Sequence, residues 1–156
     1  MLIYLGSDHA GFELKEKIKK YLKELGYAAE DKGAFKFDPD DDYPDFIRPV
    51  AEAVAASSES RGLIFGGSGQ GEAIVANRVK GIRAAVFYGV YGGKWVGFGD
   101  KIVRLSRDHN DANILSIGAR FVDENTAKNA VRLWLKTPFS GEARHRRRID
   151  KIDPKN

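Results

Sequence analysis

The sequence predicts a three-layer α/β/α fold in which helices cover both faces of a five-stranded parallel sheet. Three observations support it: short apolar runs alternate with stretches of helical spacing, glycine or polar turns separate them, and 156 residues suffice for one buried core. No internal repeat or linker divides the chain, so residues 1–156 are expected to form a single domain. In this fold class, ligands bind beyond the carboxyl ends of the strands.

The five strands are expected where apolar residues follow one another between turn residues. Residues 2–5 are apolar throughout, which is typical of a parallel strand buried on both faces. Residues 27–31 form a weaker candidate. The other three are expected at residues 62–65, 83–87 and 113–117.

Helices are expected where apolar residues recur every three or four positions, or where a start or stop residue marks an end. Residues 32–43 and 88–99 carry glycines, aspartates or prolines and are expected to be loops. The expected helices are residues 12–25, a helix that starts at Pro44, residues 73–79, a helix capped by Asp100 that ends near 108, residues 123–136, and a short basic helix within about 141–152.

Composition narrows the functional class. Apolar residues make up 42% and charged residues 31% of the chain, as in soluble globular proteins, and no apolar run is long enough to span a membrane. The chain has no cysteine, which excludes disulfides and a thiol nucleophile and fits a cytoplasmic protein. The sequence contains no Cys/His cluster that would predict a metal site. The net charge of +4 is unevenly spread, with a basic segment at 144–148 and an acidic one at 38–42.

The glycine-rich segment 66–72 stands between an expected strand and an expected helix. Its glycines let successive backbone N–H groups point at one spot beside a helix N-terminus, where an anionic oxygen binds. Neither common phosphate-loop pattern fits, because Glu72 replaces the lysine of one and the last glycine of the other. We therefore interpret Glu72 as a general base, kept ionised by the helix dipole, beside a nest for developing negative charge. An ordinary strand-to-helix turn remains the alternative from these residues alone.

All three histidines lie in polar turns or in the basic segment. His9 follows the first strand, so it should face the Glu72 loop, whereas His109 precedes the fifth strand and should lie at the opposite end of the sheet. A second subunit could bring His109 to the loop. Arg144 and Arg148 are four residues apart and could clamp one phosphate.

Other readings of these residues stay open. The basic segment could be a solvated tail, or could bind nucleic acid, although no aromatic residues alternate with its arginines. The hydroxyl of Ser68 could stabilise an oxyanion or could serve the turn alone.

A set of motifs spread over nearly the whole chain resembles the ribose-5-phosphate isomerase type B family. The motifs are Gly6–Phe12, Asp42–Pro44, Gly66–Glu72, Ala76–Asn77, Gly81–Ala84, His109–Asn113, and Arg144–His145 with Arg148. The resemblance implies a Rossmann-like sheet assembled as a homodimer or homotetramer, with each active site shared between subunits. It also implies a phosphorylated sugar as the substrate and neither a membrane nor a nucleic acid as a partner.

By this resemblance, the reaction is the interconversion of ribose 5-phosphate and ribulose 5-phosphate in the pentose phosphate pathway, through a cis-enediolate and without metal or cofactor. The family assigns ring opening to His109 with Asp8, and proton transfer to a base beside the glycine-loop amides. The remaining assignments are Ser68, Gly67, Gly69 and Gly71 at the enediolate, His9, Arg120, Arg144 and Arg148 at the phosphate, Asn110 at the sugar hydroxyls, and Tyr43 from the partner subunit.

The sequence departs from the family pattern in two places. One branch uses a cysteine base where this chain has Gly66, and this chain resembles the branch with a glutamate at Glu72 and the run Asp40–Pro44. The segment at about 91–101 is also longer than the usual connection. Isomerisation of allose 6-phosphate or galactose 6-phosphate, or sugar-phosphate binding without catalysis, are the alternatives.

Overall fold

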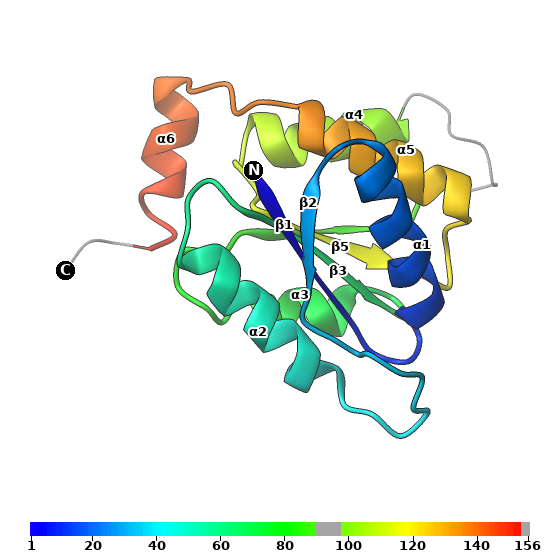
Figure 1. Ribbon diagram of the computed structural model, residues 1–156. Helices are drawn as coiled ribbons and strands as arrows, with labels where there is room; N and C mark the ends of the chain where they lie inside the picture. The colour runs from blue at the N-terminus through cyan, green and yellow to red at the C-terminus, as the bar shows by residue number, and fades with distance from the viewer. Residues whose placement is uncertain (90–97, 154–156) are drawn as a thin grey trace.

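The computed structural model describes residues 1–89 and 98–153, and Figure 1 shows its three layers. The strands are β1 (Leu2–Ser7), β2 (Ala28–Asp31), β3 (Arg61–Gly66), β4 (Ala84–Phe87) and β5 (Ile114–Gly118). They form one sheet in the order β2-β1-β3-β5-β4, and every pair of neighbours is parallel. The predicted five-stranded parallel sheet is confirmed. All strands therefore open at their carboxyl ends onto one edge.

Helices cover both faces of this sheet. One face packs against α1 (Phe12–Glu24), α4 (Phe98–Asp108) and α5 (Glu124–Lys136), and the other against α2 (Tyr43–Ala55) and α3 (Gln70–Ala76). The last helix, α6 (Ala143–Ile149), stands away from both layers, beyond the amino ends of the strands (Figure 1). No helix in residues 1–89 and 98–153 is both long and apolar enough to cross a membrane.

Two apolar clusters fix the layers against the sheet. Phe65 and Trp134 are fully buried on the α1/α5 face, and Val50 and Ile64 are fully buried on the α2/α3 face. Successive residues of β3 thus point into opposite clusters, as the alternation of a strand requires. Each such side chain stabilises the fold by about 1.5–3 kcal/mol. The loops at the carboxyl ends of the strands therefore rest on a rigid base.

Some element boundaries differ from the sequence prediction. α3 begins at Gln70 instead of 73, because Gly69 turns the chain into the helix with a φ of 76°. It ends at 76 instead of 79, since the Asn77 side chain accepts from Ala84 N at 2.8 Å and donates to Ala84 O at 3.1 Å. Asp100 lies within the first turn of α4 and is not its cap. The expected long segment 91–101 falls mainly outside the described residues.

Candidate active site

The glycine-rich loop 66–72 is held against the end of β5. The N–H of Ala119 donates to the carbonyl oxygen of Gly66 at 2.8 Å. The hydroxyl of Ser116 donates to the carbonyl oxygen of Gly69 at 2.6 Å. These bonds occupy the carbonyls of the loop on the sheet side, so its path from β3 into α3 is fixed by the neighbouring strand.

Glu72 is buried in the first turn of α3, with 4% of its surface exposed. Its carboxylate lies directly over Gly66, since a Cβ built on Gly66 would fall 1.8 Å from Glu72 Oε1. Burial raises the pKa of Glu72, the nearby charge of Asp8 raises it further, and the backbone amides of Glu72 and Gly69 lower it in part. The net pKa is raised. We expected the helix dipole to favour the ionised form of Glu72, but the effect of desolvation on its pKa is larger.

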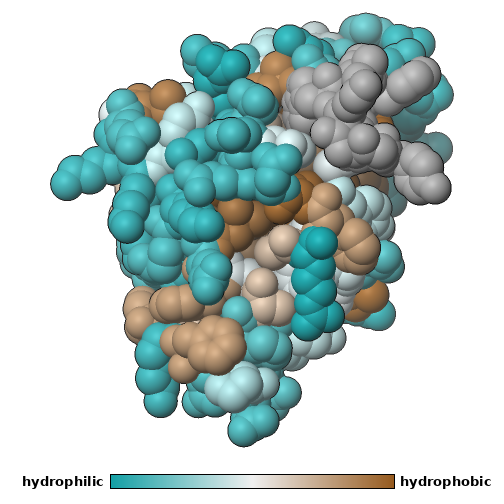
Figure 2. Space-filling view, turned by 90° about the vertical axis from the view of Figure 1, so that its right-hand side faces the viewer, coloured by the Kyte–Doolittle hydropathy of each residue, from teal (hydrophilic) through white to brown (hydrophobic). Residues whose placement is uncertain are grey.

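Asp8 and His9 come directly after β1 and face this loop, as predicted. Asp8 is 7% exposed, and its Oδ1 accepts from Gly11 N at 3.1 Å. A Cβ on Gly11 would lie 2.5 Å from Phe65 O, so the turn packs tightly against the end of β3. The carboxylates of Asp8 and Glu72 thus lie at the same edge of the sheet. Figure 2 shows this side of the molecule, with apolar surface in the middle and polar residues around it.

Arg120 and Tyr43 border the same loop. The Arg120 guanidinium lies over Gly67, where a Cβ would be 3.1 Å from Arg120 Cζ. The Tyr43 ring lies beside Gly71, where a Cβ would be 3.0 Å from Tyr43 Cζ. Tyr43 begins α2 of the same chain. The expectation that a partner subunit supplies Tyr43 to this loop is therefore wrong.

The hydroxyl of Ser68 has a local role. It accepts a hydrogen bond from the N–H of Gln70 at 3.3 Å, across the turn that starts α3. Its own proton is free to be donated elsewhere, because accepting a bond does not use it. Ser68 can thus support the turn and still reach an oxyanion.

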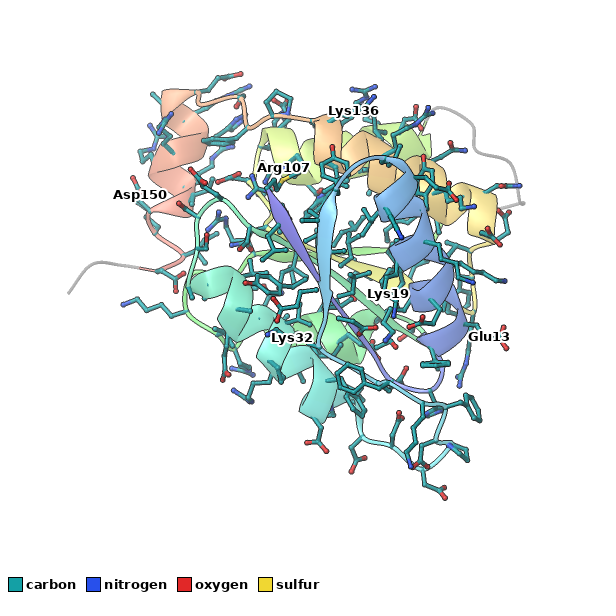
Figure 3. All side chains as sticks on the ribbon, viewed as in Figure 1. Glu13, Lys19, Lys32, Arg107, Lys136 and Asp150 are labelled. Atoms are coloured by element: carbon teal, nitrogen blue, oxygen red, sulfur yellow. The ribbon has the colours of Figure 1, made fainter. Side chains whose placement is uncertain are left out.

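His109 and Asn110 lie at the opposite edge of the sheet, as their place before β5 predicted. β5 is 5 residues long and separates the two edges by about 16 Å. Figure 3 shows the same separation, with Arg107 near the amino ends of the strands and Glu13 at the other end of the sheet. One chain therefore carries the Glu72 loop and the His109 turn at sites that cannot meet.

A partly buried ion-pair network holds the His109 turn. Asp111 has a φ of 45°, and its carboxylate bonds Arg107 Nη1 at 2.7 Å and Arg83 Nη2 at 3.1 Å. Arg83 Nε also donates to Asn110 O at 2.9 Å. Arg107, 4% exposed, donates to Ala112 O at 2.6 Å. The turn is thereby fixed from both sides.

His109 also contacts His145 of α6. Their ring centroids are 4.2 Å apart with a tilt of 38°. His145 is 2% exposed, and its Nδ1 is 2.8 Å from Ser140 Oγ. Burial, and then the proximity of His109, lower the pKa of His145, which keeps it neutral beside its neighbour. α6 is thus joined to the His109 turn.

The arginines of α6 reach outward. Arg144 Nε donates to Glu142 Oε2 at 2.7 Å, and both side chains are more than half exposed. Arg148 is exposed one turn further along the helix. Neither residue lies near the Glu72 loop of its own chain, because α6 stands beyond the amino ends of the strands (Figure 1).

Within the described residues, one group of histidine and carboxylate side chains gathers closely, and two of its atoms are already hydrogen-bonded to each other. It consists of Asp8, His9 and Asp41, whose donor atoms lie within 4.8 Å of one another. His9 Nδ1 and Asp41 Oδ1 are hydrogen-bonded to each other at 2.7 Å. The sequence predicted Asp8 and His9 at this edge but not Asp41, because nothing in the acidic segment 38–42 indicates which aspartate points inward.

Comparison with known proteins decides the family. The sequence model described as Ribose/Galactose Isomerase matches residues 3–152. The chain belongs to the ribose/galactose isomerase family. A relative in Mycolicibacterium paratuberculosis, named Ribose-5-phosphate isomerase B, is 43% identical over 150 residues, which cover 96% of this chain and 88% of the relative.

Solved structures of other isomerases agree with the fold. A ribose 5-phosphate isomerase from Thermotoga maritima is 40% identical with a TM-score of 0.86, covering 97% of both chains. Ribose-5-phosphate isomerase B from Mycoplasma genitalium, solved with bound ribulose-5-phosphate, is 38% identical with a TM-score of 0.87 and covers 97% of this chain and 93% of its own. The chain thus shares its fold with these isomerases.

Proposed function

We propose that this member of the family interconverts ribose 5-phosphate and ribulose 5-phosphate, with Glu72 as the base. The observation that carries the proposal is the buried Glu72 carboxylate over Gly66, beside a glycine-rich loop at the ligand end of the sheet. The names of the relatives supply the sugar phosphate.

Proton transfer between C2 and C1 needs one group that accepts and then returns a proton. Such a base is most effective when its pKa lies near the working pH. Burial moves the pKa of Glu72 in that direction. As the proton leaves, negative charge develops on the sugar oxygens, where the amides of Gly67, Gly69 and Gly71 and the hydroxyl of Ser68 would stabilise it.

The phosphate would be held from two sides. His9 and Arg120 approach the loop from the same chain. Arg144 and Arg148 would come from α6 of a second copy, since they lie far from the loop of their own chain. Arginine binds phosphate with two parallel hydrogen bonds, which suits the exposed guanidinium groups of α6.

We infer that two copies share each site, in a homodimer or homotetramer. His109, which would open the furanose ring with Asp8, and Asn110, which would bind the sugar hydroxyls, lie at the wrong edge of their own sheet. The edge strand β4 offers a surface for a second copy, since Ile74 and Tyr88 beside it are 61% and 44% exposed and line a hollow of about 500 Å³.

The direct test is an isomerase assay with ribose 5-phosphate in the presence of a chelator. Glu72→Gln should fold normally and lose about 10²- to 10⁴-fold in turnover, the usual contribution of a general base. Glu24→Gln, at the exposed carboxyl end of α1, is the matched control and should keep full activity. Near-wild-type turnover of Glu72→Gln would refute the assignment of the base.

Isomerisation of a 6-phosphohexose is the second candidate, favoured by the family description, which includes galactose. Comparing kcat/KM for ribose 5-phosphate, allose 6-phosphate and galactose 6-phosphate separates the candidates. A sugar-phosphate sensor would bind these ligands without exchanging the C2 proton in D₂O. The cytoplasmic location and the absence of nucleic-acid and membrane partners stay predictions.

A further inference from the structure

The acidic segment 38–42 contains one aspartate that differs from its neighbours. The side chain of Asp41 is only 7% exposed, whereas Asp40 and Asp42 are exposed. Burying a carboxylate is costly unless a partner compensates its charge. Asp41 therefore has a specific partner to account for its inward position.

That partner is His9. Asp41 Oδ1 lies 3.0 Å from His9 N, which donates to it, and 2.7 Å from His9 Nδ1. The second oxygen, Asp41 Oδ2, is buried without a hydrogen-bond partner. Because Nδ1 donates its proton to the carboxylate, Nε2 is the imidazole nitrogen left for a ligand.

The protonation state of His9 then decides what Nε2 can do. In the neutral ring with its proton on Nδ1, Nε2 carries a lone pair and repels a phosphate oxygen. In the imidazolium, Nε2 carries a proton and donates a charge-assisted hydrogen bond to phosphate. The charged form therefore binds a phosphate oxygen much more strongly than the neutral ring does.

We propose that Asp41 is a positioning residue that holds His9 as an imidazolium, with Nε2–H free to bind the phosphate of the substrate. This inference rests on the proposed function, since it gives His9 its phosphate. It also assigns a role within the acidic run: Asp41 acts on the site, and Asp40 and Asp42 do not.

The groups around His9 act in the same direction on balance. The hydrogen bond that His9 donates to Asp41 is the largest cause and raises the pKa of His9. Burial lowers this pKa, the charge of Asp8 raises it and that of Arg120 lowers it. The edge of Phe37 contacts the ring, with the centroids 6.3 Å apart. The adjoining hollow of about 410 Å³ also presents charged side chains, which are Glu13, Lys17, Asp123 and Glu124.

The titration of His9 in the free protein tests this inference without any assay of activity. The chain has three histidines, so three imidazole signals are expected in the NMR spectrum, and His9→Gln identifies one of them. In Asp41→Asn the pKa of His9 should fall relative to wild type. In Asp40→Asn, the matched exposed control, it should stay unchanged. Asp41→Glu keeps a carboxylate and should restore much of the raised pKa.

Binding of inorganic phosphate gives the second readout. Loss of a hydrogen bond to a charged group corresponds to a loss of about 10- to 100-fold in affinity, which Asp41→Asn should show near neutral pH. For ribose 5-phosphate, the same variant should raise KM more than it lowers kcat. An unchanged His9 titration in Asp41→Asn, or an equal shift in Asp40→Asn, would overturn the inference. A shifted titration in a protein that isomerises no pentose phosphate would instead count against the proposed function alone.

Discussion

The Glu72 carboxylate fills the space that a side chain on Gly66 would occupy. A Cβ on Gly66 would lie 1.8 Å from Glu72 Oε1 and 2.0 Å from Cδ. Positions 66 and 72, although six residues apart, thus compete for one volume at the end of β3. The structure accounts for the pairing of a glycine at one position with a glutamate at the other.

Gly66→Ala is expected to displace the Glu72 carboxylate and to lower both stability and turnover. Adding a methyl group to a site without room for it typically lowers the free energy of unfolding by about 1–3 kcal/mol. In a Glu72→Ala background the space is free, so the same substitution should cost much less. A double-mutant cycle of unfolding free energies measures this coupling. Additive effects of the two substitutions would contradict the shared volume.

The raised pKa of Glu72 predicts the pH dependence of catalysis. The base must be ionised, so kcat/KM should fall with decreasing pH through a pKa above the ordinary value of 4.5. Asp8→Asn removes a nearby negative charge and should move this acid limb to lower pH. Ribulose 5-phosphate is the substrate for this comparison, because its conversion does not need the ring-opening role of Asp8. The substrate phosphate titrates equally for both enzymes, and Asp8 also raises the pKa of His9, whose deprotonation affects the basic limb, so the shift of the acid limb reports Glu72.

The raised pKa of Glu72 also predicts that ionisation of this carboxyl group lowers the stability of the fold. A carboxyl group whose pKa is higher in the folded state binds its proton more tightly there, so ionisation of Glu72 costs stability as pH rises above the unfolded value. Glu72→Gln should therefore unfold at a temperature equal to or above that of wild type at neutral pH. A lower melting temperature at pH 7 would show that the ionised carboxylate is stabilising.

His109 and its supports should affect ring opening more than proton transfer. Ribulose 5-phosphate cannot close a furanose ring through its phosphorylated O5, so its exchange of carbon-bound hydrogen in D₂O requires no ring opening. His109→Gln and Asp111→Asn should slow the conversion of ribose 5-phosphate by about 10²-fold or more while leaving this exchange largely intact.

Glu72→Gln provides the contrast, since it should abolish exchange as well as conversion. Asp111→Asn tests positioning, because Asp111 reaches His109 only through the turn that it pairs with Arg83 and Arg107. Loss of exchange in His109→Gln to the level of Glu72→Gln would contradict the division of roles.

Lys15 is expected to contribute strongly to stability. It is fully buried, bonds both carboxylate oxygens of Asp31 at 2.8 Å and donates to Ala34 O at 2.6 Å. Lys15→Ala should lower the free energy of unfolding by about 3–5 kcal/mol, since it leaves a half-buried carboxylate with fewer partners. Lys20→Ala, at an exposed position of the same helix, should change it by less than about 0.5 kcal/mol.

The pH dependence of this pair follows from Asp31. Burial raises the pKa of Asp31, and hydrogen bonds from Lys15 and Lys19 lower it by more, so the net pKa is lowered. The pair therefore stabilises the fold above the unfolded pKa of Asp31 and loses this contribution as pH falls through the lowered folded value. Chemical denaturation of wild type and Lys15→Ala should converge in acid.

Much of the fold was predictable because the signals are local. The buried parallel strand β1 begins with the apolar run 2–5, and the glycine-rich loop from Gly66 to Glu72 is typical of a strand-to-helix turn. Helix ends were less accurate, since Asn77 closes α3 through a bond to β4 that no local pattern records. The raised pKa of Glu72 was missed for a related reason: desolvation depends on packing, and the sequence showed only the helix dipole.

The sequence predicted the residues of the candidate site but not the side chains that position them. The positions of His9 and His109 followed from strand order, whereas Asp41 and Asp111 required knowledge of which side chain in a polar turn points inward. The resemblance assigned Tyr43 to the partner subunit, whereas the start of α2 places it beside Gly71 of its own chain. Contacts between distant segments, such as that of His109 with His145, are set by tertiary packing.

Subunit complementation tests most directly whether the Glu72 loop of one copy works with the His109 turn of another. Glu72→Gln and His109→Gln homo-oligomers should each be nearly inactive. When the two variants are mixed by refolding or coexpression, half of the dimers are hybrids. Each hybrid has one intact site of two, so the mixture should show about one quarter of wild-type activity. A mixture no more active than its separate components would contradict the shared site.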